Sequence, residues 1–261
     1  MKSMIRLTSV ALIIVLFASC LFSCEMILGK NPTKVLEQAD KALDSAPYTA
    51  LMGIDYSSED EKMAEAIEHL STPAIKMCVD GGDFTAEMSH KLNGMDASYK
   101  YTVIGGMIYY DSCVEGTDSN TVIKQKAVYT ESMRDGIISR FGAGANLRAD
   151  DFENVAAVGM NGVVIVTCTD IKDAALMGVV DMLERDLSDI GATVAIKDAS
   201  LTLQIEDGKY TVSLFVCSYV IATDTDVYEL TLTHGTQFDY ESQVKISIPE
   251  NIDEYISAPL V

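Results

Sequence analysis

Residues 201–221, LTLQIEDGKYTVSLFVCSYVI, predict a long β-hairpin. The first arm alternates apolar and polar residues, as a strand with one buried face does. Asp207-Gly208 between the arms is a strong signal for a two-residue hairpin turn. In the second arm both sides of the strand become apolar, with Phe215 and Tyr219 on the side opposite Leu214. Because such a strand is covered on both faces, we expect another layer of structure to pack on the hairpin.

Further strands follow the hairpin at short intervals. A turn over 223–226 leads into a strand from Val227 to His234, and apolar residues alternate again over 244–248 until Pro249 stops the pairing. Short turns join antiparallel neighbours, whereas parallel strands need long crossover connections. The C-terminal part of the chain therefore predicts an antiparallel meander.

Upstream of the hairpin, several more stretches have the period of two that is typical of strands. They are Tyr48 to Tyr56, Ala74 to Val79, Phe84 to His90, Ser98 to Asp111 with a turn at Gly105-Gly106, Thr121 to Tyr129, and Val163 to Thr169. The acidic stretch 57–70 between the first two strands has a short helical face, but we interpret it as a solvated loop.

Two longer helices are predicted beside a short one around Ile137. Asn31-Pro32-Thr33 begins the first, because Asn is a good N-cap and Pro is tolerated in the first turn. The second runs over 174–190 between Asp173 and Gly191. Its apolar stripe predicts packing on an apolar surface. The stripe consists of Leu176, Val180, Leu183, Leu187 and Ile190.

The N-terminus has the build of a secretory signal peptide. Lys2 and Arg6 precede an apolar run over 7–17, and small residues follow it. The run is marginally short for an uncleaved membrane anchor, which needs about 20 apolar residues.

Two tetrapeptides then resemble the bacterial lipobox, in which the cysteine is acylated and becomes the first residue of the mature protein. They are Phe17-Ala18-Ser19-Cys20 and Leu21-Phe22-Ser23-Cys24. The small pair before Cys20 favours that residue, while Cys24 and an ordinary signal peptide stay open as alternatives. We expect a signal peptide over 1–19, or 1–23 if Cys24 is acylated, a tether over 20–30 and one domain over 31–261. Two or three acyl chains, such as palmitate, hold a protein stably on a membrane. This predicts an extracytoplasmic protein that is lipid-anchored to the bacterial cell membrane.

The charge of the chain excludes several partners. The formal net charge is −20, and removing Lys2 and Arg6 with the signal leaves 17 basic residues against 39 acidic ones, a net charge of −22. Such a chain is repelled by nucleic acid and by anionic lipid surfaces. We therefore expect no nucleic-acid partner, and membrane contact only through the tether.

No pattern of catalytic residues emerges. His69, His90 and His234 are scattered, with no acid at metal-ligand spacing, and His234 is expected at the surface. Asp224-Thr225-Asp226 lacks the length and the central glycine of a calcium loop, so we interpret it as a solvated turn. We predict a protein that is not an enzyme and that has neither a metal site nor a cofactor.

The four remaining cysteines are isolated in the sequence, which argues against zinc and thioredoxin-type sites. Three of them lie in apolar, strand-like runs, where a thiol is most often a small buried hydrophobe. One or two disulfides stay open, without a pairing. The four are Cys78, Cys113, Cys168 and Cys217.

The layout resembles the LolA-like lipoprotein family, which includes the LppX-type lipoproteins. The resemblance lies in the opening helix Pro32 to Leu43, GGMIYYD at 105–111, DGKYTVSLFV at 207–216 and THGTQFDYESQVKISIPE at 233–250. It implies an α+β fold of a single domain, in which a strongly curved antiparallel sheet, a half-barrel, wraps around a few helices. Members of the family leave a hydrophobic cavity between the sheet and the helices.

The resemblance implies a membrane-anchored lipoprotein that binds an acyl chain or lipid for transport or sensing in the cell envelope. The alternative is a structural or interaction lipoprotein with a filled core and no small ligand, since the same apolar residues suit ordinary core packing. Protein partners are not indicated. The candidate ligand contacts are Leu176, Met177, Val180, Leu183, Leu187, Phe215 and Tyr219.

Overall fold

The computed structural model describes residues 31–68, 73–92, 95–116, 120–130, 132–138, 147–160, 162–186, 193–223 and 226–258. The signal peptide, Cys20 and Cys24 lie outside these residues, and so do His69, Leu187 and positions 224 and 225. The helices of the described part are α2 (Pro32–Ser45), α3 (Glu61–Glu68), α4 (Ser132–Ile138) and α5 (Asp173–Asp186).

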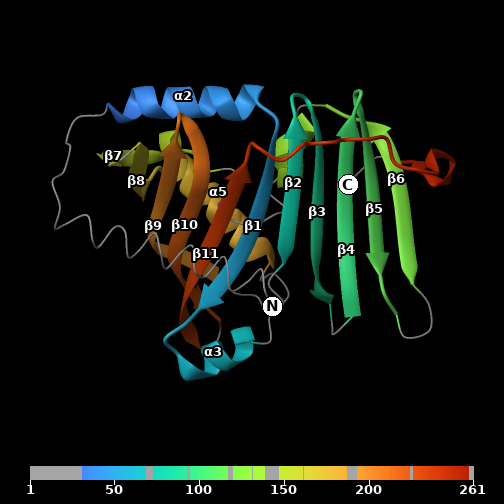
Figure 1. Cartoon of the computed structure of the whole chain (residues 1–261). Coiled ribbons are helices and arrows are strands. Elements are labelled where there is room, and N and C mark those ends of the chain that lie inside the picture. The colour runs from blue at the N-terminus through green and yellow to red at the C-terminus, as the bar shows by residue number, and fades with distance from the viewer. Residues whose placement is uncertain are drawn as a thin grey trace. The chain divides into compact units, whose positions relative to one another are not determined.

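Most of the described chain is β-structure (Figure 1). The strands are β1 (Tyr48–Ser57), β2 (Ala74–Asp80), β3 (Asp83–Leu92), β4 (Met95–Ile104), β5 (Met107–Val114), β6 (Thr121–Val128), β7 (Phe152–Met160), β8 (Val163–Ile171), β9 (Thr193–Glu206), β10 (Lys209–Ala222), β11 (Val227–Asp239) and β12 (Ile256–Ser257). They form one sheet in the order β12-β6-β5-β4-β3-β2-β1-β11-β10-β9-β8-β7. The short β12 pairs parallel to β6, which makes the sheet mixed.

The predicted fold class, an α+β half-barrel wrapped around helices, is therefore wrong, because the chain is mainly β and its sheet does not close. The strand order has two ends, β12 and β7, and the described residues form twelve strands but only four α-helices. The physical reason lies in the helices, two of which have only seven and eight residues. They present too little apolar surface to form a layer that a sheet encloses.

The chain divides into two compact units. The first comprises residues 1–42, 53–70 and 143–236, and the second comprises 43–52, 71–142 and 237–261. Strands β1 and β11 contribute residues to both units. The domain bounds expected from the sequence stay a prediction.

The predicted hairpin forms the centre of the first unit as β9 and β10. Asp207 and Gly208 both have positive φ, 49° and 73°, as a two-residue turn of this hand requires. Helix α2 lies against this turn, since a Cβ added at Gly208 would come within 2.4 Å of Gln38 Nε2. The hydroxyl of Tyr210 also donates a hydrogen bond of 2.7 Å to Asp40 of α2. Both observations fix the first helix on the end of the hairpin.

The second unit contains the meander β2 to β6, in which each strand pairs antiparallel with the next (Figure 1). One face of these strands carries the buried apolar side chains, among them Ile75, Val79, Ala86, Val103 and Ile108. We call the opposite face the outer face. The C-terminal segment, residues 240–258, crosses these strands in Figure 1 and ends beside β6, where β12 pairs.

Several elements differ from those expected. Residues 243–249 form no strand, because Pro249 blocks a long ladder and only β12 pairs with the sheet. Strand β11 continues to Asp239, so His234 lies inside a strand and is buried rather than at the surface. The stretch expected as a loop contains α3, whose first turn is capped by Asp60 accepting from the Met63 N–H at 3.0 Å. Strand β7 was not predicted.

Candidate binding site

The residues expected to contact a hydrophobic ligand lie in the first unit, and three of them are deeply buried. Phe215, Tyr219 and Leu183 are 1%, 2% and 5% exposed. Leu176 and Val180 are half-buried, while Met177 is 64% exposed. The assignment of these residues to a ligand stays a prediction, since their burial is also what core side chains show.

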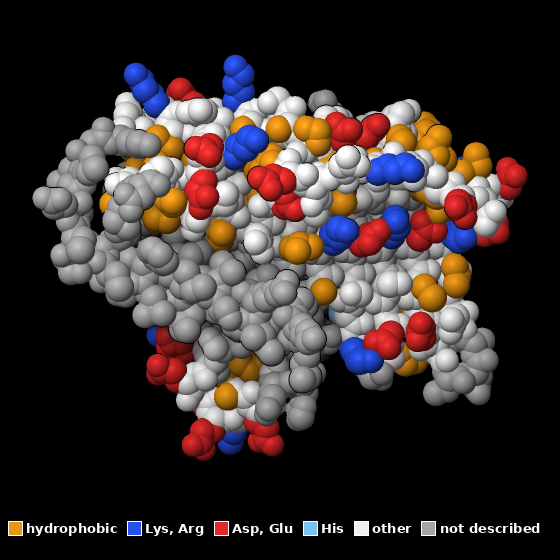
Figure 2. Space-filling view, in the orientation of Figure 1, with side chains coloured by type: hydrophobic (Ala, Val, Ile, Leu, Met, Phe, Trp, Pro, Cys, Tyr) orange, Lys and Arg blue, Asp and Glu red, His pale blue; other side chains and the backbone are white. Residues whose placement is uncertain are grey.

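A ladder of alternating charges crosses the outer face of the second unit. Directly opposite one another on neighbouring strands lie Lys76, Glu87, Lys100, Asp111 and Lys124, one each from β2 to β6. Figure 2 shows this as a band of alternating blue and red side chains over the part of the surface that these strands form. Opposite charges at facing positions attract, so the ladder favours this register. We call these five residues the charge ladder.

The charge ladder is only partly paired within itself. Lys100 Nζ lies 2.6 Å from Glu87 Oε1. Lys124 instead contacts Glu254 of the C-terminal segment, with Nζ 2.6 Å from Oε2. This hydrogen bond, together with the charges of Glu254 and Asp111, raises the pKa of Lys124. Lys124 therefore stays protonated at neutral pH.

Tyr255 anchors the C-terminal segment on this face. Its side chain is 5% exposed, and its ring packs edge-on against Tyr109, with centroids 5.4 Å apart. Its hydroxyl donates a hydrogen bond of 2.5 Å to Asp111 Oδ2. Burial and this hydrogen bond raise the pKa of Tyr255. Nearby, Lys126 Nζ donates to the carbonyl oxygen of Ile252 at 3.1 Å.

A pocket of about 510 Å³ lies between the C-terminal segment and the outer face. All five residues of the charge ladder line it, with the buried Thr102 among them and with Lys245 and residues 247–251 on the side of the segment. We call it the ladder pocket. Its lining is polar, and four lysines contribute to it: Lys76, Lys100, Lys124 and Lys245.

Thr102 is the most unusual residue of the ladder pocket. It is 1% exposed, and within the described residues its hydroxyl oxygen has no hydrogen-bond partner. Buried polar groups are nearly always hydrogen-bonded, because leaving one unpaired costs free energy. A hydroxyl of this kind that lines a pocket marks a position where a ligand atom or a water completes the bonding.

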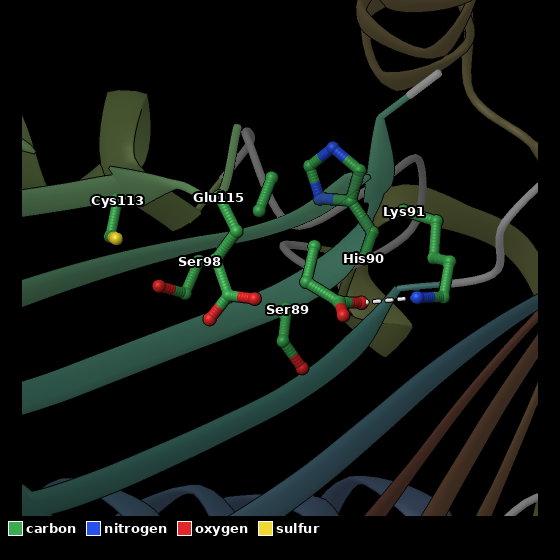
Figure 3. Close-up of a pocket in the computed structure, with 8 residues that line it drawn as sticks. Ser89, His90, Lys91, Ser98, Cys113 and Glu115 are labelled. Carbon is green, nitrogen blue, oxygen red and sulfur yellow. Dashed lines mark hydrogen bonds and ion pairs between the residues drawn. The ribbon is translucent and has the colours of Figure 1, made fainter. Parts of the chain in front are cut away.

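A second pocket, of about 280 Å³, lies at the ends of β3, β4 and β5 (Figure 3). Ser89, Ser98 and Cys113 face one another across these strands on the outer face. His90 points to the other face, as Figure 3 shows, and stacks on Tyr99. Strand alternation thus separates the one histidine of this lining from Ser89, Ser98 and Cys113, so the pocket holds no histidine-activated nucleophile.

Three further groups with shifted pKa values are buried within strands of the first unit. Burial raises the pKa of Cys168 to about 11 and that of Cys217 to about 12, and it lowers the pKa of His234 to about 4. These groups are neutral at pH 7 and suit core positions. All four described cysteines are free thiols. The described residues contain no cluster suited to a metal ion and no helix long and apolar enough to cross a membrane.

Comparison with known proteins adds little. No protein-family model and no curated protein matches the chain. The crystal structure of MucB in complex with MucA(peri) aligns with 82% of this chain and 100% of its own at 8% identity, with a TM-score of 0.11. The dehydratase domain of the polyketide PpsC from Mycobacterium tuberculosis aligns with 80% of this chain and 81% of its own at 11% identity, with a TM-score of 0.12. Likenesses this weak carry no argument about fold or function, and the LolA-like resemblance stays a prediction.

The ladder pocket was not foreseen from the sequence. Its residues come from five strands and from a segment that follows more than a hundred residues later. Each strand contributes only one or two polar residues at alternate positions, which is the ordinary pattern of a solvated face. Only the register of the strands, which places those positions side by side, indicates the pocket.

Proposed function

We propose that this chain is a lipid-anchored, non-enzymatic binding protein of the bacterial cell envelope, whose site is the ladder pocket. The observation that carries the proposal is the buried Thr102 hydroxyl, which lines this pocket and has no partner within the described residues. The lining favours a small polar ligand over an acyl chain, because its side chains are mainly charged or hydroxyl-bearing.

The anchor rests on the two lipobox-like tetrapeptides that end in Cys20 and Cys24. A binding role rather than catalysis is supported by the separation of His90 from Ser89 and Ser98, which leaves these serines without a histidine to activate them. No sequence motif of a known catalytic class offers a replacement.

The ligand we propose is polar, in place of the hydrophobic one expected from the sequence. The deep burial of Phe215, Tyr219 and Leu183 favours the alternative of a filled core, since each is covered by other parts of the protein. Neither described pocket is lined by any of the residues expected to hold an acyl chain.

Two experiments test the function. The first follows incorporation of labelled palmitate into the full chain in a bacterial host. We expect loss of label in Cys20→Ala or in Cys24→Ala, which also identifies the acylated thiol. Full labelling of the double variant, or no labelling of the wild type, contradicts the anchor.

The second experiment locates the ligand site. The full chain, extracted in a neutral detergent, is screened by melting temperature against sugars, amino acids, dicarboxylates and phosphate esters, with lipid extraction in parallel. For each binder, hydrogen–deuterium exchange identifies the protected peptides. We expect protection in peptides that cover 76–87, 100–111 and 245–255. Protection at α5 instead, or co-purified lipid with no polar binder, contradicts the ladder pocket as the site.

A further inference from the structure

Lysines are concentrated at the ladder pocket against the overall charge of the chain. The protein has 39 acidic and only 19 basic residues, yet four lysines line this pocket. An exposed lysine is hydrated without a partner, but a lysine that no carboxylate of the protein engages keeps its charge available to an anion. The partners of each lysine therefore show how much positive charge is left for a ligand.

Two of the four lysines are neutralised by the protein itself. Lys100 pairs with Glu87, and Lys124 pairs with Glu254. Asp111, the remaining carboxylate of the charge ladder, accepts a hydrogen bond from the hydroxyl of Tyr255. The contacts of Lys124 with Glu254 and of Asp111 with Tyr255 hold the C-terminal segment against the sheet and complete one wall of the pocket.

The other two lysines are free to meet a ligand. Within the described residues, Lys76 and Lys245 form no ion pair, and the facing carboxylate of Glu87 is engaged by Lys100. They come from opposite walls, since Lys76 lies on β2 and Lys245 on the C-terminal segment. The one carboxylate of the lining without a partner in this part of the chain is Glu250. Two ammonium groups thus stand against a single carboxylate.

Thr102 adds a neutral donor to the lining of the same pocket. Its register neighbours on the outer face are Thr85 and Tyr109. Its hydroxyl is buried without a partner in the described residues, so a ligand oxygen that accepts its proton is favoured by the whole cost of leaving it unpaired. A hydroxyl can donate or accept, and the ammonium groups of Lys76 and Lys245, unpaired among the described residues, favour a ligand that accepts, such as a carboxylate or phosphate oxygen.

From these observations we infer that the ladder pocket binds an anionic oxygen group, a carboxylate or a phosphate. Lys76 and Lys245 hold the group from opposite walls, and the Thr102 hydroxyl donates to one of its oxygens. This inference rests on the proposed function and names the ligand class of that same site. Glu250 opposes the anion, which limits the charge that the site accepts.

The test uses the full chain in a neutral detergent and isothermal titration calorimetry. The probes are inorganic phosphate, succinate as a carboxylate and glycerol as an uncharged control. We expect 1:1 binding of phosphate or succinate, whichever group the site prefers, and none of glycerol. Because both lysines are exposed, raising the salt concentration weakens the binding.

Four variants separate the contributions. Lys76→Met and Lys245→Met each weaken binding about tenfold or more, since each removes a charge-assisted hydrogen bond. Glu250→Gln strengthens binding, because it removes the opposing charge. Thr102→Val weakens binding without lowering the melting temperature, since an unpaired hydroxyl contributes nothing to the fold. The matched control is Lys62→Met on α3, an exposed lysine of the first unit, and it leaves binding unchanged.

Every outcome bears on the inference. Binding of either anion with the expected order of variants supports it, and the tighter probe identifies the group. Anion binding that neither lysine variant weakens indicates an adventitious ion only and overturns it. If neither anion binds while a neutral polar molecule protects the peptides around Thr102, the ligand class is wrong but the proposed function stands. If nothing binds there, both are overturned.

Discussion

Replacing Tyr255 tests whether the C-terminal segment is held on the outer face by one side chain. The ring is buried against Tyr109, and the hydroxyl donates to the carboxylate of Asp111 at 2.5 Å. Tyr255→Phe removes only the hydrogen bond, whereas Tyr255→Ala also removes the packed ring. The two variants therefore separate the polar contribution of this anchor from the apolar one.

The magnitudes follow from the geometry. Hydrogen bonds to charged groups contribute about 1.5 to 3 kcal/mol, and we expect about 1.5 kcal/mol here because Asp111 is half-exposed. Truncation of a buried aromatic ring to alanine costs about 3 to 5 kcal/mol. Since 1.4 kcal/mol is a factor of ten, opening of the segment rises about tenfold in Tyr255→Phe and more than a hundredfold in Tyr255→Ala.

Hydrogen exchange measures this opening directly. The amide of Ala258 donates to the carbonyl oxygen of Lys126 at 3.2 Å, so its protection reports whether the segment is docked on β6. The control is Tyr228→Phe, because that half-buried tyrosine has no hydrogen-bond partner within the described residues. Equal protection of Ala258 in wild type and Tyr255→Ala would refute the anchor. Equal loss in both Tyr255 variants would show that the hydroxyl alone holds the segment.

Three more predictions concern the first unit. Burial lowers the pKa of His234 to about 4 in the folded protein. Between pH 4 and 6.5 the folded state therefore binds fewer protons than the unfolded state, and the free energy of unfolding decreases as the pH falls through this range. The loss approaches about 3 kcal/mol, and we expect urea titrations of His234→Gln to show a smaller dependence on pH. Gly208→Ala lowers the melting temperature, because a residue with a Cβ is destabilised by about 1 kcal/mol in the left-handed backbone conformation at φ 73°. The control, Asp207→Asn at the neighbouring position, has little effect. An aromatic disulfide reagent leaves Cys168 and Cys217 unmodified in the folded protein while the two half-buried described cysteines react, and equal rates for all four would contradict the burial.

Local features of this fold were predictable from sequence, and long-range ones were not. The Asp207-Gly208 hairpin and the Asn31 cap depend on neighbouring residues, and the structure confirms both, with Asn31 Oδ1 accepting from the Thr33 N–H at 3.0 Å. The apolar stripe predicted a helix over 174–190, and the structure confirms it over 173–186, while 187–190 lie outside the described residues. Among the side chains of α5 whose burial is described, only Val179 and Leu183 are fully buried. The alternation over 244–248 predicted a strand that does not form, because alternation shows two faces but not a partner.

The candidate site was harder to predict because it depends on register. Lys76 and Lys124 are far apart in the sequence, and only four successive antiparallel pairings bring them into one row. A shift of one residue in any pairing would turn that strand's charged residues towards the core. Sequence patterns specify which residues share a face, but not which residues of neighbouring strands face one another.

The charge ladder contributes little to the stability of the fold. Substitutions in it can therefore test ligand binding without unfolding the protein. Exposed ion pairs contribute about 0 to 1 kcal/mol each, and Lys100 and Glu87 are both about half-exposed. The register is therefore fixed mainly by the buried face, where Ile75 and Val103 lie. Lys76, which forms no pair in the described part of the chain, contributes less still to stability. A large effect of Lys76→Met on anion affinity, together with an unchanged melting temperature, then measures ligand binding rather than folding.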